Sequence, residues 1–274
     1  MKKLIVFFSL LTALLVVPVG VHAQVLEESV KNDEVVQRET LEKEINDIRE
    51  IYRGQLSDYR DAEKAFSIAR DQYHQLQTLA SINDATESSR KVFVLRDEVL
   101  MTYFQLLRTS IIAADGIEVS LKEVVVKRLE MQVIWLIDHK KRVEQMQDRT
   151  QFNALADEII EKADVFTEIS LQSTSILALG KLQDVYDRLV VVRKDISEVE
   201  AKSSTADRSR NSKETDKMIN AVKGTIDTTW VNLGEDVRED NVTSFSSNLV
   251  KTLEPIYSGL NKTVSFLQEL LREI

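Results

Sequence analysis

The sequence predicts an all-α fold, an elongated coiled-coil-like bundle of about seven antiparallel helices in which the first helix is very long. Helix breakers are scarce, with seven glycines and two prolines in 274 residues, and helix-forming residues occur throughout. Apolar residues recur at intervals of three and four. The valine runs at 124–126 and 190–192 resemble strands, but charged residues flank them at helical spacing, so we predict helix there too.

The N-terminal residues predict export. Met1-Lys2-Lys3 is positively charged, an apolar run follows, and Val21 and Ala23 are small residues at the positions that a signal peptidase reads. We therefore expect a signal peptide at 1–23, with cleavage between Ala23 and Gln24, and a secreted, periplasmic or cell-surface protein of bacterial type. The alternative is an uncleaved anchor, because the apolar stretch from Leu4 to Val21 approaches the length of a membrane span.

Composition excludes several classes of partner and site. The formal net charge of −9 disfavours nucleic acids and anionic lipid headgroups, which attract clustered basic residues. The chain has no cysteine, so it has neither disulfides nor a lipid-bearing cysteine. We expect its stability to come from helix packing alone.

The first helix carries the longest periodic pattern, from about Glu27 to Ala80. Its period is about 3.55 residues, close to the 3.5 of supercoiled helices. At roughly 1.5 Å per residue such a helix is about 80 Å long, which is why we expect an elongated molecule. The predicted buried stripe is Leu41, Ile45, Ile48, Tyr52, Leu56, Tyr59, Ala62, Phe66, Ala69, Tyr73, Leu76 and Ala80.

The second and third helices follow polar interruptions. We predict a break at 81–84, where Asn83 or Asp84 caps the next helix. Glu87, three residues after Asp84, would complete a capping box from the first turn. The following stretch, 92–114, is apolar around most of its circumference and predicts the centre of the core. Asp115-Gly116 predicts its end, and Ser120 with Glu123 predicts a capping box for a helix reaching about Asp148.

The remaining helices are predicted from capping residues, breaks and periodicity. Thr150 caps a fourth helix that breaks or kinks at the polar cluster 172–175 or at Gly180, and a fifth helix ends in a polar linker. Two more follow, and Pro255 kinks or restarts the last one. The predicted division is a main bundle at 24–202, a linker at 203–211 and a C-terminal helical pair at 212–274 that packs on the main bundle.

Few residues suggest site chemistry. Asp71 and His74 lie one helical turn apart, as in di-iron bundles, but those sites need two such pairs and further carboxylates. Asp138 and His139 are adjacent, and adjacent helical residues do not face each other. No nucleophile or phosphate-binding motif occurs. We therefore predict no catalytic, cofactor-binding or metal residue, and no cofactor.

These observations predict an exported, non-catalytic helical protein that acts as an extracytoplasmic scaffold, adhesion or protein-interaction module. Its partner is another protein or a second copy, bound through helix seams, and membrane contact requires retention of the N-terminal segment as an anchor. One alternative is a membrane-active helical bundle of the lipid-binding or pore-forming type. A further alternative is a helical-bundle enzyme whose site has no known motif.

Overall fold

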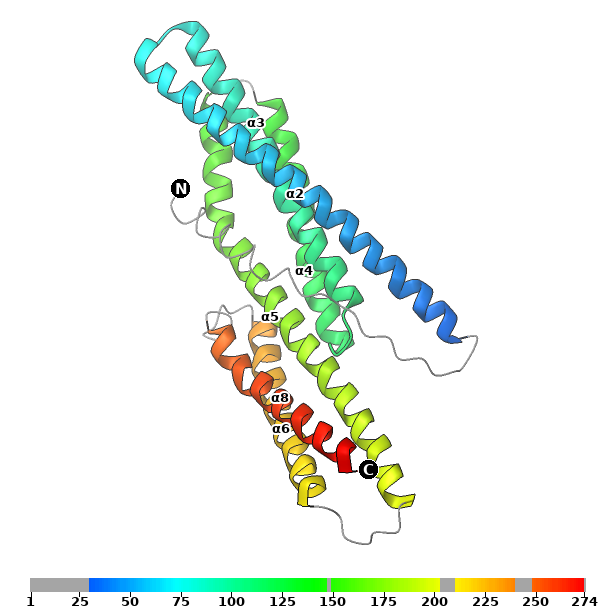
Figure 1. Cartoon of the computed structure of the whole chain (residues 1–274). Coiled ribbons are helices and arrows are strands. Elements are labelled where there is room, and N and C mark those ends of the chain that lie inside the picture. Colours follow the sequence, from blue (N-terminus) through cyan, green and yellow to red (C-terminus); the bar gives the residue numbers. More distant parts are fainter. Residues whose placement is uncertain (1–29, 147–148, 203–209, 240–247, 274) are drawn as a thin grey trace. The chain divides into compact units, whose positions relative to one another are not determined.

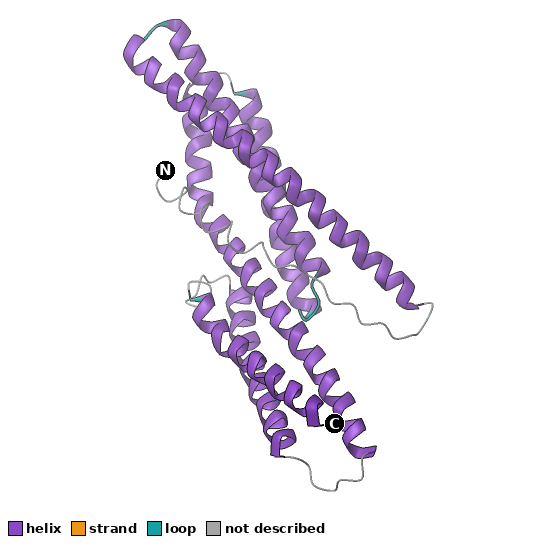
Figure 2. Ribbon diagram, in the orientation of Figure 1, coloured by secondary structure: helices purple, strands orange, loops and turns teal. Residues whose placement is uncertain are grey.

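The computed structural model describes residues 30–146, 149–202, 210–239 and 248–273, and all regular structure in these ranges is α-helical (Figures 1 and 2). The all-α prediction is confirmed. Six helices are described, one fewer than predicted, because two predicted helices form one. They are α2 (Val30–Leu76), α3 (Leu79–Ala113), α4 (Val119–Gln145), α5 (Arg149–Lys202), α6 (Arg210–Glu239) and α8 (Leu249–Glu273).

The contacts between helices divide the chain into two units that do not follow chain order. Unit 1 contains the described residues up to Thr109 and Leu129–Ile169, and unit 2 contains Ser110–Arg128 and Ser170–Ile274. Helices α3, α4 and α5 therefore contribute residues to both units. The elongated shape stays a prediction, and so do the boundaries at 203–211, most of which lie outside the described residues.

Helix α2 buries the predicted stripe over its second half. Tyr52, Leu56, Tyr59, Ala62 and Ala69 are all buried, and Phe66 of the predicted stripe is half-buried. The stripe ends earlier than predicted, because Leu76 and Ala80 are exposed. The heptad-like pattern thus locates the face of α2 that packs in unit 1.

The turn between α2 and α3 lies at residues 77–78, so the predicted break at 81–84 is wrong. Gln77 adopts a left-handed conformation with φ of 48°, and its amide donates to the carbonyl of Tyr73 at 3.0 Å. Thr78 and Ser81 then form a capping box: the Ser81 amide donates to the Thr78 hydroxyl, and the Thr78 amide donates to the Ser81 hydroxyl. Asn83, Asp84 and Glu87 lie inside α3, where Glu87 pairs with Arg90 instead of capping.

Helix α3, predicted to lie at the centre of the core, supplies core residues to both units. Val99, Phe104 and Ile111 are fully buried. The predicted end is also confirmed, because α3 ends at Ala113 and Gly116 has a φ of 72°. The predicted capping box of α4 is wrong: Ser120 lies inside the helix and donates to Glu118 at 2.6 Å.

The end of the third predicted helix and the start of the fourth differ slightly from the structure. Helix α4 ends at Gln145, and Asp148 lies outside the described residues. Helix α5 begins at Arg149, so Thr150 lies in its first turn.

Helix α5 continues unbroken through 172–175 and Gly180, so the predicted break is wrong. The hydroxyls of Thr174 and Ser175 donate to the carbonyls of Ser170 and Leu171, at 2.9 and 2.7 Å. Such bonds to the preceding turn satisfy a buried hydroxyl without interrupting the helix. The polar cluster is therefore a buried part of one long helix, and Ser173 and Ser175 are 0% exposed.

Two glycines allow the turn between α3 and α4 to lie against α5 in unit 2. A Cβ on Gly180 would meet Ile117 Cγ1 at 2.6 Å, and one on Gly116 would meet the Gly180 carbonyl oxygen at 2.5 Å. Lys122 donates to the carbonyls of Ile112 and Ala114, at the end of α3. Gly180 is thus a packing residue of α5 rather than a helix break.

The second half of α5 packs with α6 and α8 in unit 2. Ile196 of α5 clusters with Leu267 and Leu270 of α8, and Leu189 packs against them. Helix α8 continues through Pro255, so the helix does not restart there. On α8, Ile256 and Leu270 are buried, whereas Leu271 is 57% exposed.

Candidate functional site

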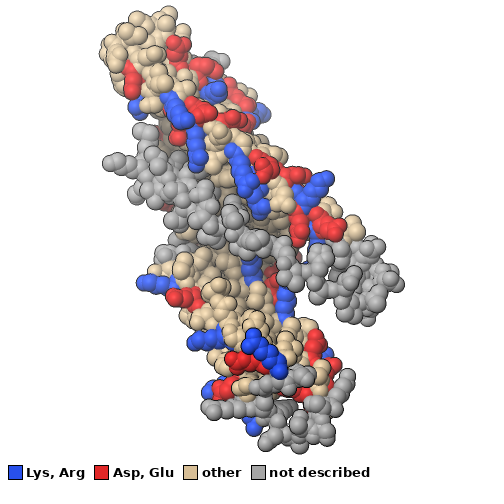
Figure 3. Space-filling view, in the orientation of Figure 1, with Lys and Arg blue, Asp and Glu red and all other residues tan. Residues whose placement is uncertain are grey.

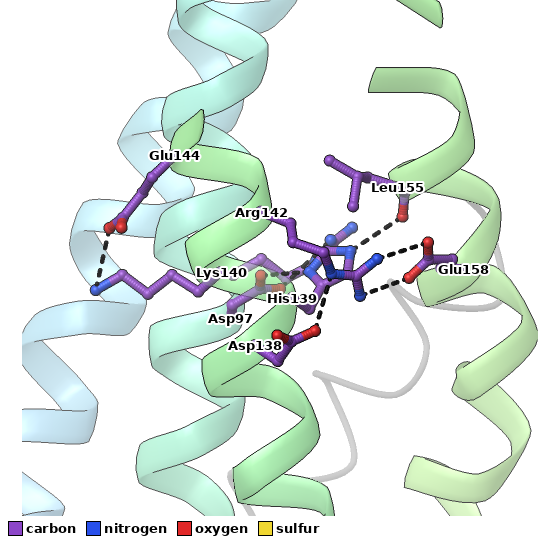
Figure 4. Close-up of polar contacts among 9 residues, drawn as sticks. Asp97, Asp138, His139, Lys140, Arg142, Glu144, Leu155 and Glu158 are labelled. Carbon is purple, nitrogen blue, oxygen red and sulfur yellow. Dashed lines mark hydrogen bonds and ion pairs between the residues drawn. The ribbon is translucent and has the colours of Figure 1, made fainter. Parts of the chain in front are cut away.

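The strongest candidate site is a buried polar cluster in unit 1, centred on His139 of α4 (Figure 4). Its Nδ1 lies 2.6 Å from Oδ2 of Asp97 on α3, and its Nε2 lies 3.1 Å from the carbonyl oxygen of Leu155 on α5. His139 and Asp97 are both 0% exposed. One imidazole therefore connects three helices whose contacting residues lie far apart in the sequence.

The hydrogen bonds fix where the protons of this pair lie. A carbonyl oxygen only accepts, so Nε2 of His139 carries a hydrogen that it donates to Leu155. A second proton lies between Nδ1 and the Asp97 carboxyl group, because two acceptors cannot approach to 2.6 Å without one. The histidine and aspartate together are thus electrically neutral, which makes their burial tolerable.

Arg96 brings a positive charge beside the pair. Its Nη2 lies 3.4 Å from Oδ1 of Asp97, and its guanidinium lies over the ring of Phe93, 4.2 Å from the centroid. Burial lowers the pKa of Arg96, and the nearby carboxylates of Asp97 and Glu63 partly offset this effect. Burial and a hydrogen bond to Glu63 also raise the pKa of the Tyr59 hydroxyl.

Aromatic rings cover the histidine on one side. The Trp135 ring stacks on His139 with centroids 5.0 Å apart and an interplanar angle of 17°, and its edge meets Phe166 at 5.6 Å. The ammonium of Lys162 lies 5.6 Å from the Trp135 ring. Stacked rings hold the imidazole in one orientation and exclude water from it.

Partly exposed ion pairs, some within α4 and some between helices, lie around the cluster (Figure 4). Lys140 contacts Glu98 at 2.6 Å, and Arg142 contacts Asp138 at 2.9 Å and Glu158 at 2.7 Å. The hydrogen bond from Arg142 lowers the pKa of Glu158, although partial burial opposes this shift. Because these side chains are partly exposed, the pairs contribute little energy and chiefly favour one register of the helices.

The cluster has part of the geometry of a catalytic base but not its accessibility. A carboxylate that orients an imidazole is the arrangement found in nucleophilic hydrolases. Here, however, the ring nitrogen that would activate a nucleophile is bonded to the Leu155 carbonyl, and neither His139 nor Asp97 reaches solvent. In this conformation the cluster fixes helix positions and offers no route to a substrate.

Sequence reasoning missed this cluster because it tested only neighbours in the chain. Asp138, the neighbour of His139, pairs with Arg142 of the same helix. The true partner, Asp97, precedes His139 by 42 residues. The available signal was Arg96-Asp97, two adjacent charged residues within a segment that is apolar around most of its circumference.

The other predicted positions do not form a site in the part of the chain that the structure describes. His74 is exposed in the last turn of α2, and Asp71 contacts Arg70 at 3.2 Å. Within the described ranges, no three His, Cys, Asp or Glu side chains group as metal ligands would. The cleavage residues Ala23 and Gln24 lie outside the described residues. A shallow depression on α8, between Glu254 and Ser265, is lined by residues of that helix alone.

Comparisons with known proteins return no relative: no family model, no curated protein and no solved structure matches this chain. Among the six described helices, none has the length and apolarity needed to cross a bilayer.

Proposed function

We propose that the chain is an exported, non-catalytic helical protein that acts as an extracytoplasmic scaffold, adhesion or protein-interaction module. The observation that carries this proposal is a contrast within α4. Its most chemically capable side chain, His139, is sealed inside unit 1, whereas large apolar side chains lie exposed on the same helix. Groups that could react thus hold the helices together, and groups that could bind a partner face outward.

The exposed apolar residues of α4 lie on successive turns. Met131, Ile134 and Ile137 are 56%, 66% and 53% exposed, while Leu136 between them is fully buried. Exposed aliphatic residues grouped on one helix mark protein contact sites more often than isolated ones do. Asp138 and Lys141 lie exposed beside them and supply a polar rim.

A capture experiment tests the interaction role. The exported protein is immobilised and exposed to an envelope extract of its host, in parallel with a variant carrying Met131→Gln, Ile134→Gln and Ile137→Gln. We expect the native chain to retain a defined protein that the triple variant loses, while Ile160→Gln, a control on α5 at a position that is 67% exposed, still retains it. Equal recovery on all three surfaces argues against the α4 face, and hydrolysis of a substrate by the purified protein argues against a non-catalytic role.

Export is tested separately by fractionating the host and measuring the N-terminus of the protein by mass spectrometry. We expect the protein outside the cytoplasm with a chain that starts at Gln24. An intact N-terminus in the membrane fraction would instead indicate a retained anchor, and cytoplasmic protein would refute this part of the proposal.

A second candidate, membrane contact, is favoured by the turn between α2 and α3. Leu76, Leu79 and Ile82 are 61%, 74% and 41% exposed there, and no Asp, Glu, Lys or Arg occurs from Gln72 to Asn83. Figure 3 shows this end of the α2–α3 hairpin as largely uncharged surface. An uncharged apolar turn can enter the interfacial region of a bilayer without the cost of burying a charge.

Flotation with phosphatidylcholine vesicles tests this second candidate. Native protein should float with the vesicles, and Leu76→Asp/Leu79→Asp should remain at the bottom of the gradient. Val250→Asp, at an exposed position of unit 2, serves as the control. Absence of flotation of the native protein at low and high salt would eliminate membrane contact by this turn.

A further inference from the structure

Two helices of unit 2 carry exposed apolar residues at seven-residue spacing. On α5 these are Val185, Val192 and Val199, which are 41%, 38% and 45% exposed. On α8 they are Tyr257 and Leu271, 61% and 57% exposed, with the partly buried Val264 between them. A seven-residue apolar repeat marks a helix face that packs along another helix.

The contacts of α5 place its stripe on one side of the helix. Leu189 and Ile196 face α8, whereas Arg193 faces α6 through Asp216 and Ser212. At 100° per residue, Val192 lies about 40° from Ile196, on the side away from Arg193. The valines therefore border the contact with α8 on the side opposite α6.

The contacts of α8 place its stripe on the same side. Leu267 faces α5, and Gly259 lies against Val222 of α6. By the same geometry, Val264 and Leu271 border the contact with α5 on the side away from Gly259. Figure 1 shows the second half of α5 running in the same direction as α8, with α6 antiparallel to both, so the two stripes border the same seam.

The stripes also lie at matching levels. Ile196 packs with Leu267 and Leu270, which sets Val192 beside Val264 and Val199 beside Leu271. We call the set Val185, Val192, Val199, Tyr257, Val264 and Leu271 the α5–α8 face. It extends over about 21 Å of helix, two steps of the seven-residue repeat, with one apolar row on each helix, as in one layer of a four-helix bundle.

We propose that a second copy of this chain covers the α5–α8 face, so that α5 and α8 of the two copies form an antiparallel four-helix layer. The two-fold axis lies perpendicular to the helices at the level of Val192 and Val264, and it places α5 on the partner's α5. This inference deepens the proposed function, on which it rests for the view that the chain acts through its helix faces.

The charged residues that border the α5–α8 face support a second copy as its partner. A two-fold axis at Val192 brings Arg188 of one copy to the level of Asp195 in the other, and an axis at Val264 brings Glu254 near Arg272. Each opposite pair then occurs twice, as a two-fold contact requires. Arg188 already contacts Asp184 of its own helix at 2.8 Å and keeps 65% of its side chain exposed, so it can bridge both carboxylates. Antiparallel packing also opposes the helix dipoles favourably.

The size of the face sets the strength of the contact. With one flanking turn at each end it covers about 600 Å² per copy, below the roughly 800 Å² of a standard interface. We therefore expect a reversible dimer, with a dissociation constant in the micromolar range, rather than an obligate one.

Sedimentation equilibrium of the full chain, purified as its host processes it, tests the dimer. The apparent mass should rise from monomer to dimer over micromolar concentrations. Val192→Asp should raise the dissociation constant by roughly one to two orders of magnitude, because it buries two charges at the axis. Val191→Asp is the matched control, since Val191 is the neighbouring residue, 58% exposed and about 100° away from the face.

Two further sets of variants test the dimer if Val192→Asp unfolds. Because the chain has no cysteine, Val192→Cys and Val191→Cys each carry one thiol, and a short bis-maleimide should link the first into dimers and the second far less. Arg188→Glu and Asp195→Arg should each weaken the dimer, and the double exchange should restore it.

A monomer at all concentrations, or equal cross-linking at 191 and 192, overturns the proposed dimer. If the protein is monomeric while the α4 face still captures a partner, the dimer fails and the proposed function stands. If the dimer forms but the α4 face captures no partner, the dimer stands and the proposed contact site on α4 fails.

Discussion

The two units fix their helices by different means. In unit 1, a buried imidazole and carboxylate join α3, α4 and α5, with a guanidinium and stacked rings around them. In unit 2, the α3–α4 turn reaches α5 through two glycines, and apolar residues of α5 and α8 form a core cluster. Unit 2 also holds a largely buried polar contact between α5 and α6, where Arg193 bonds Asp216 at 2.7 Å and Ser212 at 2.6 Å.

Helix α5 takes part in both contacts, and the two contacts have opposite requirements. A buried polar group needs a particular partner at a particular distance, and loss of that partner leaves it unpaired. A backbone contact needs the absence of a side chain, and even one added methyl group disturbs it. We therefore expect the histidine–aspartate contact of unit 1 to be sensitive to deletion of polar atoms, and the glycine contact of unit 2 to addition of carbon atoms.

The largest expected effect is removal of the carboxylate from unit 1. Asp97→Ala should lower the free energy of unfolding by about 3–5 kcal/mol, because it leaves His139 buried without its partner. The measurement is urea unfolding followed by circular dichroism. Replacement of both residues by leucine should recover much of the loss, and Glu98→Ala, which removes a partly exposed ion pair one residue away, should cost less than about 1 kcal/mol. A small loss for Asp97→Ala would contradict a structural role for the pair.

Addition of one methyl group tests unit 2. Gly180→Ala should cost about 1–3 kcal/mol, because the new Cβ would lie 2.6 Å from Ile117 Cγ1. Combined with Ile117→Ala, it should cost less than the sum of the two changes, as a double-mutant cycle would reveal. Gly54→Ala is the control: no atom lies within 4 Å of its Cβ position, so it should gain up to about 1 kcal/mol of stability. Destabilisation by both alanines alike would refute the packing argument.

A smaller effect is expected from a local contact of unit 1, the capping box at the start of α3. Thr78→Ala should lower the free energy of unfolding by about 1 kcal/mol, since it removes half of the capping box at the start of α3. Thr86→Ala, inside the same helix, removes a hydroxyl that donates to the Ile82 carbonyl and should change stability by less than half as much. Hydrogen exchange of the first turn of α3 would localise the loss.

The smallest effect is the pH dependence of the outer ion pairs. The hydrogen bond from Arg142 holds the pKa of Glu158 below its usual value of 4.5 in the folded chain. This pair therefore contributes stability above pH 4.5 and loses it as the pH falls through the lower, folded value. Glu158→Gln should flatten that acid limb by less than about 1 kcal/mol, because both side chains are partly exposed. Urea unfolding between pH 3 and 7 measures it, with Glu161→Gln as the control, and a steeper limb in Glu158→Gln would contradict this assignment.

Periodic features of the fold could be predicted from sequence because they repeat locally. The spacing from Tyr52 to Ala69 identified the buried face of α2, and the apolar circumference of 92–114 identified the core segment of α3. Gly116 was identified as the end of α3 because few other residues adopt its backbone conformation.

The remaining features depended on contacts that the sequence does not show. Residues 172–175 looked like a break, but their hydroxyls bond to the preceding turn of the helix. Thr78 and Ser81 form the capping box of α3, whereas the prediction placed the cap at Asn83 or Asp84, which are also good capping residues and lie close by. The pairing of Asp97 with His139 is set by packing of helices distant in the chain, so no spacing rule could reveal it.

The stacking of Trp135 on His139 gives the protein a built-in optical probe. The chain has two tryptophans, Trp135 in unit 1 and Trp230 in unit 2, so each unit carries its own fluorophore. Replacement of Trp230 by phenylalanine leaves an emission that reports only the indole above the buried imidazole, and replacement of Trp135 isolates the other signal. Light emitted by the unlabelled chain can thus show which of the two units melts first.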